Sequence, residues 1–247
     1  MIIKKAYAKI NLFLKIKGLR KDGYHDIESL IAPIDLHDVL TFEETSDDLI
    51  TLNCNIEIEN NVVLLVAKYM KETYNKGGVQ IKLTKNIPIS SGLGGESADA
   101  AATINGLNDL WGLNLGDKEK ENIAFLFGSD IVFCLYNKPA LVKNRGSIES
   151  FVHVPNHRVI LYITDIELRT KMMFNEYDNL EKLSIYDNDF LSVIERQHDD
   201  VFCIYNVLRK YYRNVYMSGS GPTFFILDEV EQEIPIRFKS ILTTFVL

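Results

Sequence analysis

Hydrophobic and polar residues alternate along residues 6–16, which predicts a half-buried strand as an early element of the chain. The polar face of this strand presents Lys9 and Asn11 side by side. Residues 18–25 follow as a turn-rich stretch that ends in Asp22-Gly23-Tyr24-His25, where the Asp-Gly pair favours a turn. The apolar face of the strand carries Ala8, Ile10, Leu12, Leu14 and Ile16.

The middle of the chain alternates between strand-like and helix-like patterns. An apolar stripe with helical spacing predicts a helix over residues 62–74, and a glycine loop near residue 92 leads into an alanine-rich helix that runs to about residue 111. A shorter helix is expected over about 117–127. Strands are predicted for residues 38–58 (two strands), 79–83, 131–136 and 139–143, the last two as a pair.

The last third of the chain predicts a buried strand over 159–163, a helix over 190–212, and two strands within 215–227 joined by an abrupt glycine-rich turn. This mixed order of elements favours an α+β fold over a doubly wound parallel sheet. We expect two domains, residues 1–150 and 151–247, although no change in composition marks the boundary.

Composition restricts the classes of function. The chain has 247 residues, 47% of them hydrophobic, and a formal net charge of -7. This charge argues against nucleic acid as a partner, so an anionic ligand would need a local positive site. The N-terminus lacks the pattern of a signal peptide and no apolar run is long enough to span a bilayer, so we expect a cytoplasmic protein with no membrane partner.

The three cysteines, Cys54, Cys134 and Cys203, do not form a C-x-x-C motif and therefore predict neither a zinc site nor a redox pair. Cys134 and Cys203 lie in apolar runs, which predicts that both are small core residues. Nothing in the sequence indicates an oligomeric state.

Residues 88–102 have the features of a phosphate-binding segment. Glycines let the backbone approach a ligand, their free N–H groups attract anions, and the following helix adds the positive end of its dipole. A tight strand-to-helix turn without a ligand is equally compatible with the glycine content. The segment lacks the Gly-Lys-[Ser/Thr] ending of a P-loop and the G-x-G-x-x-G spacing of a dinucleotide-binding fold.

Four segments taken together resemble the GHMP kinase superfamily, and the first of them resembles the signature of the 4-diphosphocytidyl-2-C-methyl-D-erythritol kinases. They follow the order of the family and span residues 8–223. The resemblance implies an α+β, two-domain GHMP-kinase fold with ATP and substrate in the cleft between the domains. The segments are Ala8-Lys9-Ile10-Asn11-Leu12 with Asp22-Gly23-Tyr24-His25, then Pro88-x-x-x-Gly92-Leu93-Gly94-Gly95-x-Ser97-x-Asp99-Ala100-Ala101, Gly128-Ser129-Asp130-Ile131, and Met217-Ser218-Gly219-Ser220-Gly221-Pro222-Thr223.

The reaction that this resemblance implies is ATP-dependent phosphorylation of the 2-hydroxyl of 4-diphosphocytidyl-2-C-methyl-D-erythritol in non-mevalonate isoprenoid precursor biosynthesis, with Mg²⁺ accompanying ATP. Asp130 matches the catalytic aspartate, which accepts the proton of the substrate hydroxyl. Lys9 matches the catalytic lysine, which keeps that carboxylate ionised and neutralises the moving phosphoryl group. Without the motif, a turn residue and a solvated strand residue would be the better interpretations.

The resemblance also assigns binding roles. Asn11 would orient the hydroxyl or Lys9, Tyr24 would stack on the cytosine, and His25 would bind the edge of the base. Thr170 and Phe174 keep the family's Thr-x-x-x-aromatic spacing, and Phe174 would close the cytosine sandwich, with Tyr177 as a nearby competitor. The ATP-binding residues would be Pro88, Ser91, Gly92, Leu93, Gly94, Gly95, Glu96 and Ser97, and the third glycine motif is Ser218, Gly219, Ser220 and Gly221.

Several positions depart from the family pattern and keep alternatives open. Glu96 adds an anion beside the expected phosphates, Ala98 removes a hydroxyl, and Val132 stands where proline is usual. A catalytically impaired, nucleotide-binding relic of the kinase is therefore a second hypothesis. A GHMP kinase for mevalonate or homoserine is a third, but those substrates carry no base for Tyr24 to stack on. An RNA binder of related fold is disfavoured by the net charge.

Overall fold

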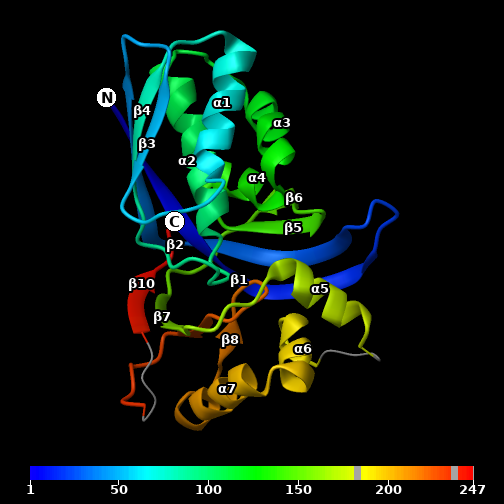
Figure 1. Cartoon of the computed structure of the whole chain (residues 1–247). Helices are drawn as coiled ribbons and strands as arrows, with labels where there is room; N and C mark the ends of the chain where they lie inside the picture. The colour runs from blue at the N-terminus through cyan, green and yellow to red at the C-terminus, as the bar shows by residue number, and fades with distance from the viewer. Residues whose placement is uncertain (181–184, 235–238, 247) are drawn as a thin grey trace. The chain divides into compact units, whose positions relative to one another are not determined.

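A computed structural model describes residues 1–180, 185–234 and 239–246 of the chain (Figure 1). These residues group into two compact units that interleave along the sequence. The predicted boundary near residue 150 stays a prediction about folding domains. Unit 1 consists of Met1–Ala8, Leu36–Pro88 and Gly94–Asn137, and unit 2 of Lys9–Asp35, Ile89–Leu93 and Lys138–Leu247.

The sheet of unit 1 is built around β4 (Val79–Thr84). This strand pairs antiparallel with Val39–Glu44, the last part of β2 (His25–Glu44), and parallel with β3 (Ile50–Cys54). Parallel neighbours need a crossover connection, and α1 (Val62–Tyr74) provides it, lying along these strands in Figure 1. The strand predicted over 79–83 is confirmed.

The bounds of α1 agree with the predicted helix. Asn61 begins the helix, because its side chain accepts a hydrogen bond from the backbone N–H of Val63 at 3.0 Å. The helix ends at Asn75, which adopts the left-handed conformation with φ 50. Its buried stripe is Val63, Val66, Ala67 and Met70.

Helix α2 (Gly95–Leu110) is buried along most of its length, because α1, α3 (Asp117–Phe127) and α4 (Ser129–Tyr136) all pack against it. Its approach to β2 is close at Gly106, where a Cβ atom would lie 2.4 Å from Cε2 of Phe42. The alanine-rich helix predicted to run to about residue 111 and the helix predicted over about 117–127 are confirmed.

The strand predicted over residues 131–136 is wrong, because these residues belong to α4. Five consecutive residues of α4, 131–135, are buried, so the apolar run has no helical periodicity that the sequence could reveal. The expected partner, β5 (Ala140–Asn144), is a strand but pairs with Ile27–Ile31 of β2 and with β6 (Ser147–Phe151).

Unit 2 contains β5 and β6, most of β1 (Ile2–Leu19), and a separate sheet of four strands in the order β10-β7-β9-β8. In that sheet β7 (Arg158–Ile163) is central, with β10 (Lys239–Thr244) on one side and β9 (Phe224–Leu227) on the other. The short strand β8 (Tyr216–Met217) pairs with β9. The strands predicted over 159–163 and within 215–227 are confirmed.

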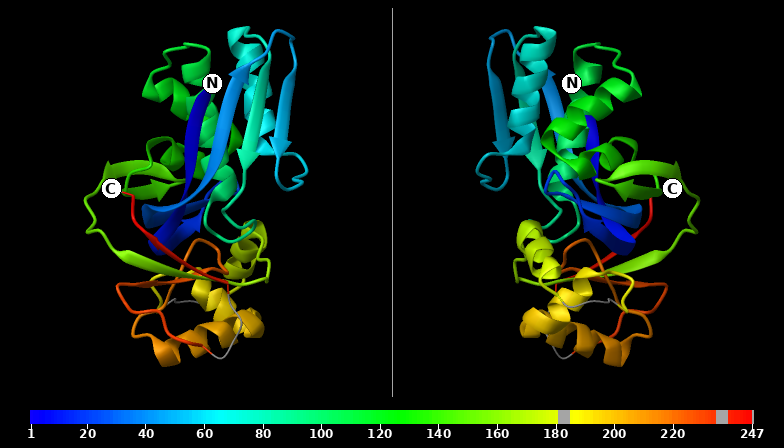
Figure 2. Two further views of the ribbon diagram at one scale, coloured as in Figure 1. Left: turned by 90° about the vertical axis from the view of Figure 1, so that its left-hand side faces the viewer. Right: turned by 90° about the vertical axis from the view of Figure 1, so that its right-hand side faces the viewer.

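The helices of unit 2 are α5 (Thr170–Asp178), α6 (Phe190–Gln197) and α7 (Asp199–Tyr211), seen from two sides in Figure 2. The single helix predicted over 190–212 is therefore wrong. The break is at His198, whose φ of -131 and ψ of 70 are not helical. Cys203 on α7 is exposed, which corrects its predicted burial, whereas Cys134 on α4 is buried as expected.

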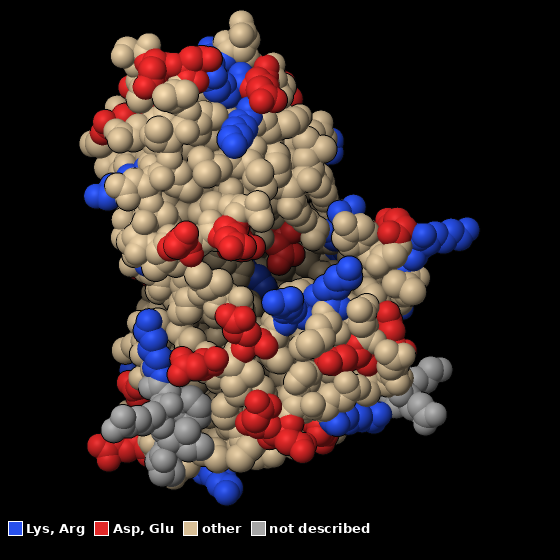
Figure 3. Space-filling model, viewed as in Figure 1, with Lys and Arg blue, Asp and Glu red and all other residues tan. Residues whose placement is uncertain are grey.

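On the face shown in Figure 3, lysine and arginine side chains are interspersed with aspartate and glutamate. The absence of a nucleic-acid partner stays a prediction that rests on the net charge of -7. Among the described residues, no helix combines the length and the apolar character that crossing a membrane requires.

The contact at Gly106 predicts a specific cost in stability. Gly106→Ala should lower the free energy of unfolding by about 1–3 kcal/mol, since a methyl group would overlap the Phe42 ring, and this outweighs the helix propensity gained. Urea unfolding measures the change. Gly77→Ala is the matched control, because no atom lies within 4 Å of its added Cβ. An equally stable or more stable Gly106→Ala protein would show that the close approach is wrong.

Candidate active site

Lys9 and Asn11, predicted to share one face of the first strand, are joined by a hydrogen bond in unit 2. The Nζ atom of Lys9 donates to Oδ1 of Asn11 at 2.8 Å, and Nδ2 of Asn11 donates to Oγ of Ser29 at 2.8 Å. The same Oδ1 atom accepts from the backbone N–H of Gly219 at 3.0 Å. Lys9 is only 5% exposed and Asn11 3%, so this face is buried rather than half-buried as predicted.

The third glycine motif packs backbone to backbone on the 89–93 loop. Ser218 Oγ donates to the carbonyl of Gly92 at 3.0 Å, and a Cβ on Gly92 would lie 2.5 Å from the Ser218 carbonyl oxygen. Gly92 also has φ +75, which favours glycine. A Cβ on Gly219 would lie 3.2 Å from Nζ of Lys9. The glycines therefore bring backbone close to the buried ammonium group.

Two residues that support this network were missed by the sequence analysis. Ser29 on β2 is fully buried, and Asn188 is 4% exposed. Nδ2 of Asn188 donates to the carbonyls of Met217 and Gly219 at 2.9 and 2.8 Å, while its Oδ1 accepts from the N–H of Phe190 at 3.0 Å. An asparagine just before an apolar helix is a recognisable start signal, but that signal does not reveal the bonds to the glycine motif.

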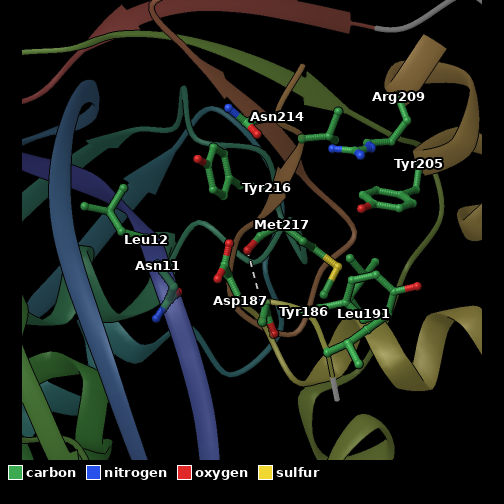
Figure 4. A pocket seen from close by; sticks show the side chains of 13 residues that line it. Asn11, Leu12, Tyr186, Asp187, Leu191, Tyr205, Arg209, Asn214, Tyr216 and Met217 are labelled. Carbon is green, nitrogen blue, oxygen red and sulfur yellow. Dashed lines mark hydrogen bonds between the residues drawn. The ribbon is translucent and has the colours of Figure 1, made fainter. Parts of the chain in front are cut away.

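A pocket of about 140 Å³ adjoins Asn11 within unit 2 (Figure 4). Burial, together with a hydrogen bond to Glu195, raises the pKa of Tyr186 to about 12, and burial also raises the pKa values of Tyr205 and Tyr216. These phenols are neutral at ordinary pH, so Asp187 and Arg209 are the charged groups of the lining. The lining residues are Asn11, Leu12, Ile185, Tyr186, Asp187, Asn188, Leu191, Tyr205, Arg209, Asn214, Val215, Tyr216 and Met217.

The predicted phosphate segment ends in unit 1 at the start of α2. Gly94 precedes the helix with φ 73, and no side chain caps the first turn. Backbone N–H groups at such a helix start lack intrahelical partners and attract anions. Glu96 lies in this first turn with its side chain exposed, and Ala98 is buried. Ser90, in the 89–93 loop, has φ 53, a left-handed conformation that is uncommon for residues other than glycine.

A buried ion cluster lies under the first turns of α2. Nζ of Lys85 bonds to Oδ2 of Asp99 at 2.6 Å and to Oδ2 of Asp38. Oδ1 of Asp38 accepts from the backbone N–H groups of Asn86 and Ile87 at 2.5 and 2.8 Å. The cluster therefore ties β2, the end of β4 and α2 together.

One lysine cannot neutralise two buried carboxylates. Burial, opposed by Lys85 but reinforced by repulsion from Asp38, raises the pKa of Asp99 to about 7. Burial alone would lower the pKa of Lys85, but attraction from Asp99 and Asp38 outweighs it and raises this pKa. Asp99 therefore holds a proton until about neutral pH.

Asp130 occupies the first turn of α4 in unit 1, partly exposed. Val132, one of the departures from the family pattern, is buried in the same short helix. Lys9 belongs to unit 2 and Asp130 to unit 1, so their pairing stays a prediction.

The residues predicted to bind the base are partly brought together within unit 2. The imidazole of His25 stacks on the ring of Phe174, with centroids 4.5 Å apart and planes 13° apart. Nε2 of His25 lies 2.8 Å from Oδ1 of Asp178. Tyr177, the competitor of Phe174, instead meets Phe190 edge to face at 6.4 Å. The predicted cytosine sandwich itself stays a prediction.

Tyr24 lies beside a different group. Its ring is 49% exposed, and the guanidinium Cζ of Arg145 lies 3.5 Å from the ring centroid. A base would therefore stack on the other face of the ring or displace the guanidinium group. Thr170, at the start of α5, hydrogen-bonds through Oγ1 to Oγ of Ser220 at 3.0 Å, which joins this helix to the third glycine motif.

Comparison with known proteins gives consistent results. A family model described as "GHMP kinases N terminal domain" matches residues 61–138. Relatives from Thermoanaerobacter sp. (strain X514) and Bacillus subtilis (strain 168) are 36% and 34% identical over 93% and 94% of this chain and 89% and 90% of their own. Both are named 4-diphosphocytidyl-2-C-methyl-D-erythritol kinase.

Solved structures show the same resemblance. The crystal structure of a 4-(cytidine 5'-diphospho)-2C-methyl-D-erythritol kinase matches with a TM-score of 0.82 and 25% identity, covering 99% of both chains. The mevalonate kinase of Methanococcus jannaschii matches with a TM-score of 0.74 and 17% identity over 100% of this chain and 98% of that one, a likeness of fold alone.

The ion cluster predicts a pH dependence of stability. The pKa of Asp99 is 3.8 when unperturbed and about 7 when folded, so folding takes up a proton between these values. The stabilisation is complete below pH 4 and is lost as the pH rises through 7. Asp99→Asn cannot titrate, so its stability relative to wild type should rise over this range, by on the order of 1 kcal/mol per pH unit at most.

Urea unfolding from pH 4 to 8 measures this difference. Asp109→Asn is the matched control, since Asp109 is an acid of the same helix whose side chain is 44% exposed. If the free energy of unfolding of Asp99→Asn differs from that of wild type by the same amount at every pH, Asp99 is not protonated in the folded protein.

Proposed function

The chain belongs to the 4-diphosphocytidyl-2-C-methyl-D-erythritol kinase family of the GHMP kinases, and from this premise we propose that it phosphorylates the 2-hydroxyl of 4-diphosphocytidyl-2-C-methyl-D-erythritol with ATP. The predicted α+β GHMP-kinase fold is confirmed. The chain is a kinase, and its family uses ATP. The reaction would serve non-mevalonate isoprenoid precursor biosynthesis in the cytoplasm.

The observation that best supports this substrate is the pair Tyr24 and His25. The half-exposed ring of Tyr24 offers a face for stacking, and His25 is held by Phe174 and Asp178 in a fixed orientation. Mevalonate and homoserine carry no base, so neither would use such a pair.

In the proposed mechanism Asp130 takes the proton of the attacking hydroxyl, and the ammonium group of Lys9 stabilises charge on the transferring phosphoryl group. Asn11 holds the ammonium in place at 2.8 Å. The uncapped N–H groups at the start of α2 bind the phosphates of ATP. Phosphoryl transfer depends mainly on such positioning and charge stabilisation.

The residues at the start of α2 are compatible with a Mg²⁺ ion that binds together with ATP. Within the described part of the chain, no three His, Cys, Asp or Glu side chains are grouped to hold a metal. Mg²⁺ at kinase sites needs only one or two carboxylates in addition to phosphates and water. Glu96, exposed in the first turn of α2, is the carboxylate that would hold it. Bound Mg²⁺ would neutralise charge that develops on the phosphates.

A catalytically impaired relic is the second candidate, because Ala98 lacks the usual hydroxyl and Val132 replaces the usual proline. A coupled assay of ADP release, with and without the cytidine substrate, separates the two functions. Substrate-dependent ADP release supports the kinase. If ATP and the cytidine compound both bind but no ADP forms, the relic hypothesis is correct.

The chemistry is tested most directly at Asp130. Asp130→Asn cannot accept a proton and should lower kcat by about 10²–10⁴-fold while both ligands still bind. Lys9→Met should also lower kcat. The double variant should lose far less than the product of the two single losses, because residues that act as one unit are not additive.

Steady-state kinetics and calorimetric titration measure these quantities, and Asp109→Asn is again the control. Normal turnover of Asp130→Asn, or full additivity of the two changes, would contradict the proposed mechanism.

Base stacking is tested at Tyr24. Tyr24→Ala should weaken binding of CDP by about 1–3 kcal/mol, the usual loss for one base–aromatic stack, and leave ATP affinity unchanged. Titration calorimetry with CDP and ATP measures both. Tyr211→Ala removes another exposed aromatic ring and serves as the control. Equal losses for CDP and ATP would mean that Tyr24 is structural.

A further inference from the structure

We propose that Asp178 fixes the tautomer of His25 and thereby makes the base site select cytosine over uracil. Asp178 is a positioning residue in this inference, because it acts on the base through His25. The inference rests on the proposed function, in which His25 binds the edge of the base.

The imidazole of His25 is held on two sides by α5. Phe174 covers one ring face at 4.5 Å, and Asp178 meets Nε2 at 2.8 Å. The two residues are four positions apart and so share one face of the helix. The side chain of His25 is only 6% exposed, whereas that of Asp178 is 37% exposed. The ring therefore has little freedom to turn.

The contact with Asp178 determines which ring nitrogen carries the proton. An ionised carboxylate only accepts hydrogen bonds, so Nε2 of His25 must donate to it. In a neutral imidazole the other nitrogen, Nδ1, is then an acceptor. A carboxylate that sets the tautomer of a functional histidine in this way is a common arrangement in metal sites and in catalytic triads.

An acceptor at Nδ1 distinguishes the two pyrimidines. Cytosine has an amino group at position 4, which donates a hydrogen bond, whereas uracil, like thymine, has a carbonyl oxygen there, which accepts one. Nδ1 can therefore bind the amino group of cytosine but faces the lone pairs of the uracil oxygen. With the opposite tautomer, Nδ1–H would favour uracil.

A second histidine–carboxylate pair on the same helix provides a matched control. Nε2 of His198 lies 2.8 Å from Oε2 of Glu176, which is also on α5. Loss of this pair would loosen α5 without changing the proton on His25. Glu176→Gln therefore reports the effect of helix packing alone.

The experiment compares Asp178→Asn with Glu176→Gln. The amide that Asp178→Asn introduces can donate to Nε2 and so stabilise the Nδ1–H tautomer, as the same replacement does in serine proteases. Wild type should bind CDP more tightly than UDP, and Asp178→Asn should reduce this ratio by about tenfold or more. Glu176→Gln should keep the ratio, and Asp178→Glu should restore much of it. ATP affinity should not change in any variant.

Nitrogen-15 NMR of histidine-labelled protein reads the tautomer without a ligand, with His25→Gln identifying the signal. Wild type and Glu176→Gln should show the Nε2–H form, and Asp178→Asn should not. If wild type has this tautomer but binds CDP and UDP equally, His25 does not recognise the edge of the base. That result would also contradict the proposed function. If wild type prefers CDP while Asp178→Asn keeps that preference, or Glu176→Gln loses it equally, only the role of Asp178 is overturned.

Discussion

A buried ammonium group is the constraint on which the candidate site depends. Lys9 is almost fully enclosed, and a buried charge is costly unless it is paired or hydrogen-bonded. Asn11 meets this need, and its own position is set by Ser29 and by the backbone of Gly219. The third glycine motif is held in turn by Asn188. Glycine is favoured at Gly219 because its φ is +57 and because a Cβ there would lie 2.9 Å from the carbonyl oxygen of Gly92.

Unit 1 also buries a lysine ammonium group, but there carboxylates balance its charge. Lys85 is buried between two carboxylates, and the surplus negative charge is relieved because Asp99 keeps a proton near neutral pH. This cluster supports the first turns of α2 with a group that carries little net charge. A net negative cluster at this place would oppose an anion at the helix start, so the protonation of Asp99 would favour the phosphate predicted to bind there.

Helix α5 connects His25, which is predicted to bind the base, to the third glycine motif within unit 2. Its start, at Thr170, bonds to Ser220, and its later residues hold the imidazole of His25. The bond between His198 and Glu176 adds a third attachment, at the break between α6 and α7. Because these contacts involve side chains on one short helix, a shift of α5 would change several predicted binding residues together.

The sequence by itself determined the features that depend on neighbouring residues. Period-two alternation placed Lys9 and Asn11 on one face, and an apolar stripe beginning at Val62 gave the bounds of α1. The glycine loops and the Tyr24-His25 pair were recognised from their resemblance to the family's motifs, and the α+β class followed from the order of elements. These signals lie within a few residues of each other and need no knowledge of the fold.

The tertiary structure decided the features that depend on contacts between residues far apart in the sequence. The apolar run at 131–136 became α4 rather than a strand, because burial on all sides leaves no periodic signal. The contacts of Asn188 with the glycine motif and of Asp178 with His25 join residues about 30 and 150 positions apart, respectively. Phe174 rather than Tyr177 stacks on His25, although both rings meet Phe190 edge to face. Such choices depend on which surfaces meet when the chain folds, and a local pattern carries no record of them.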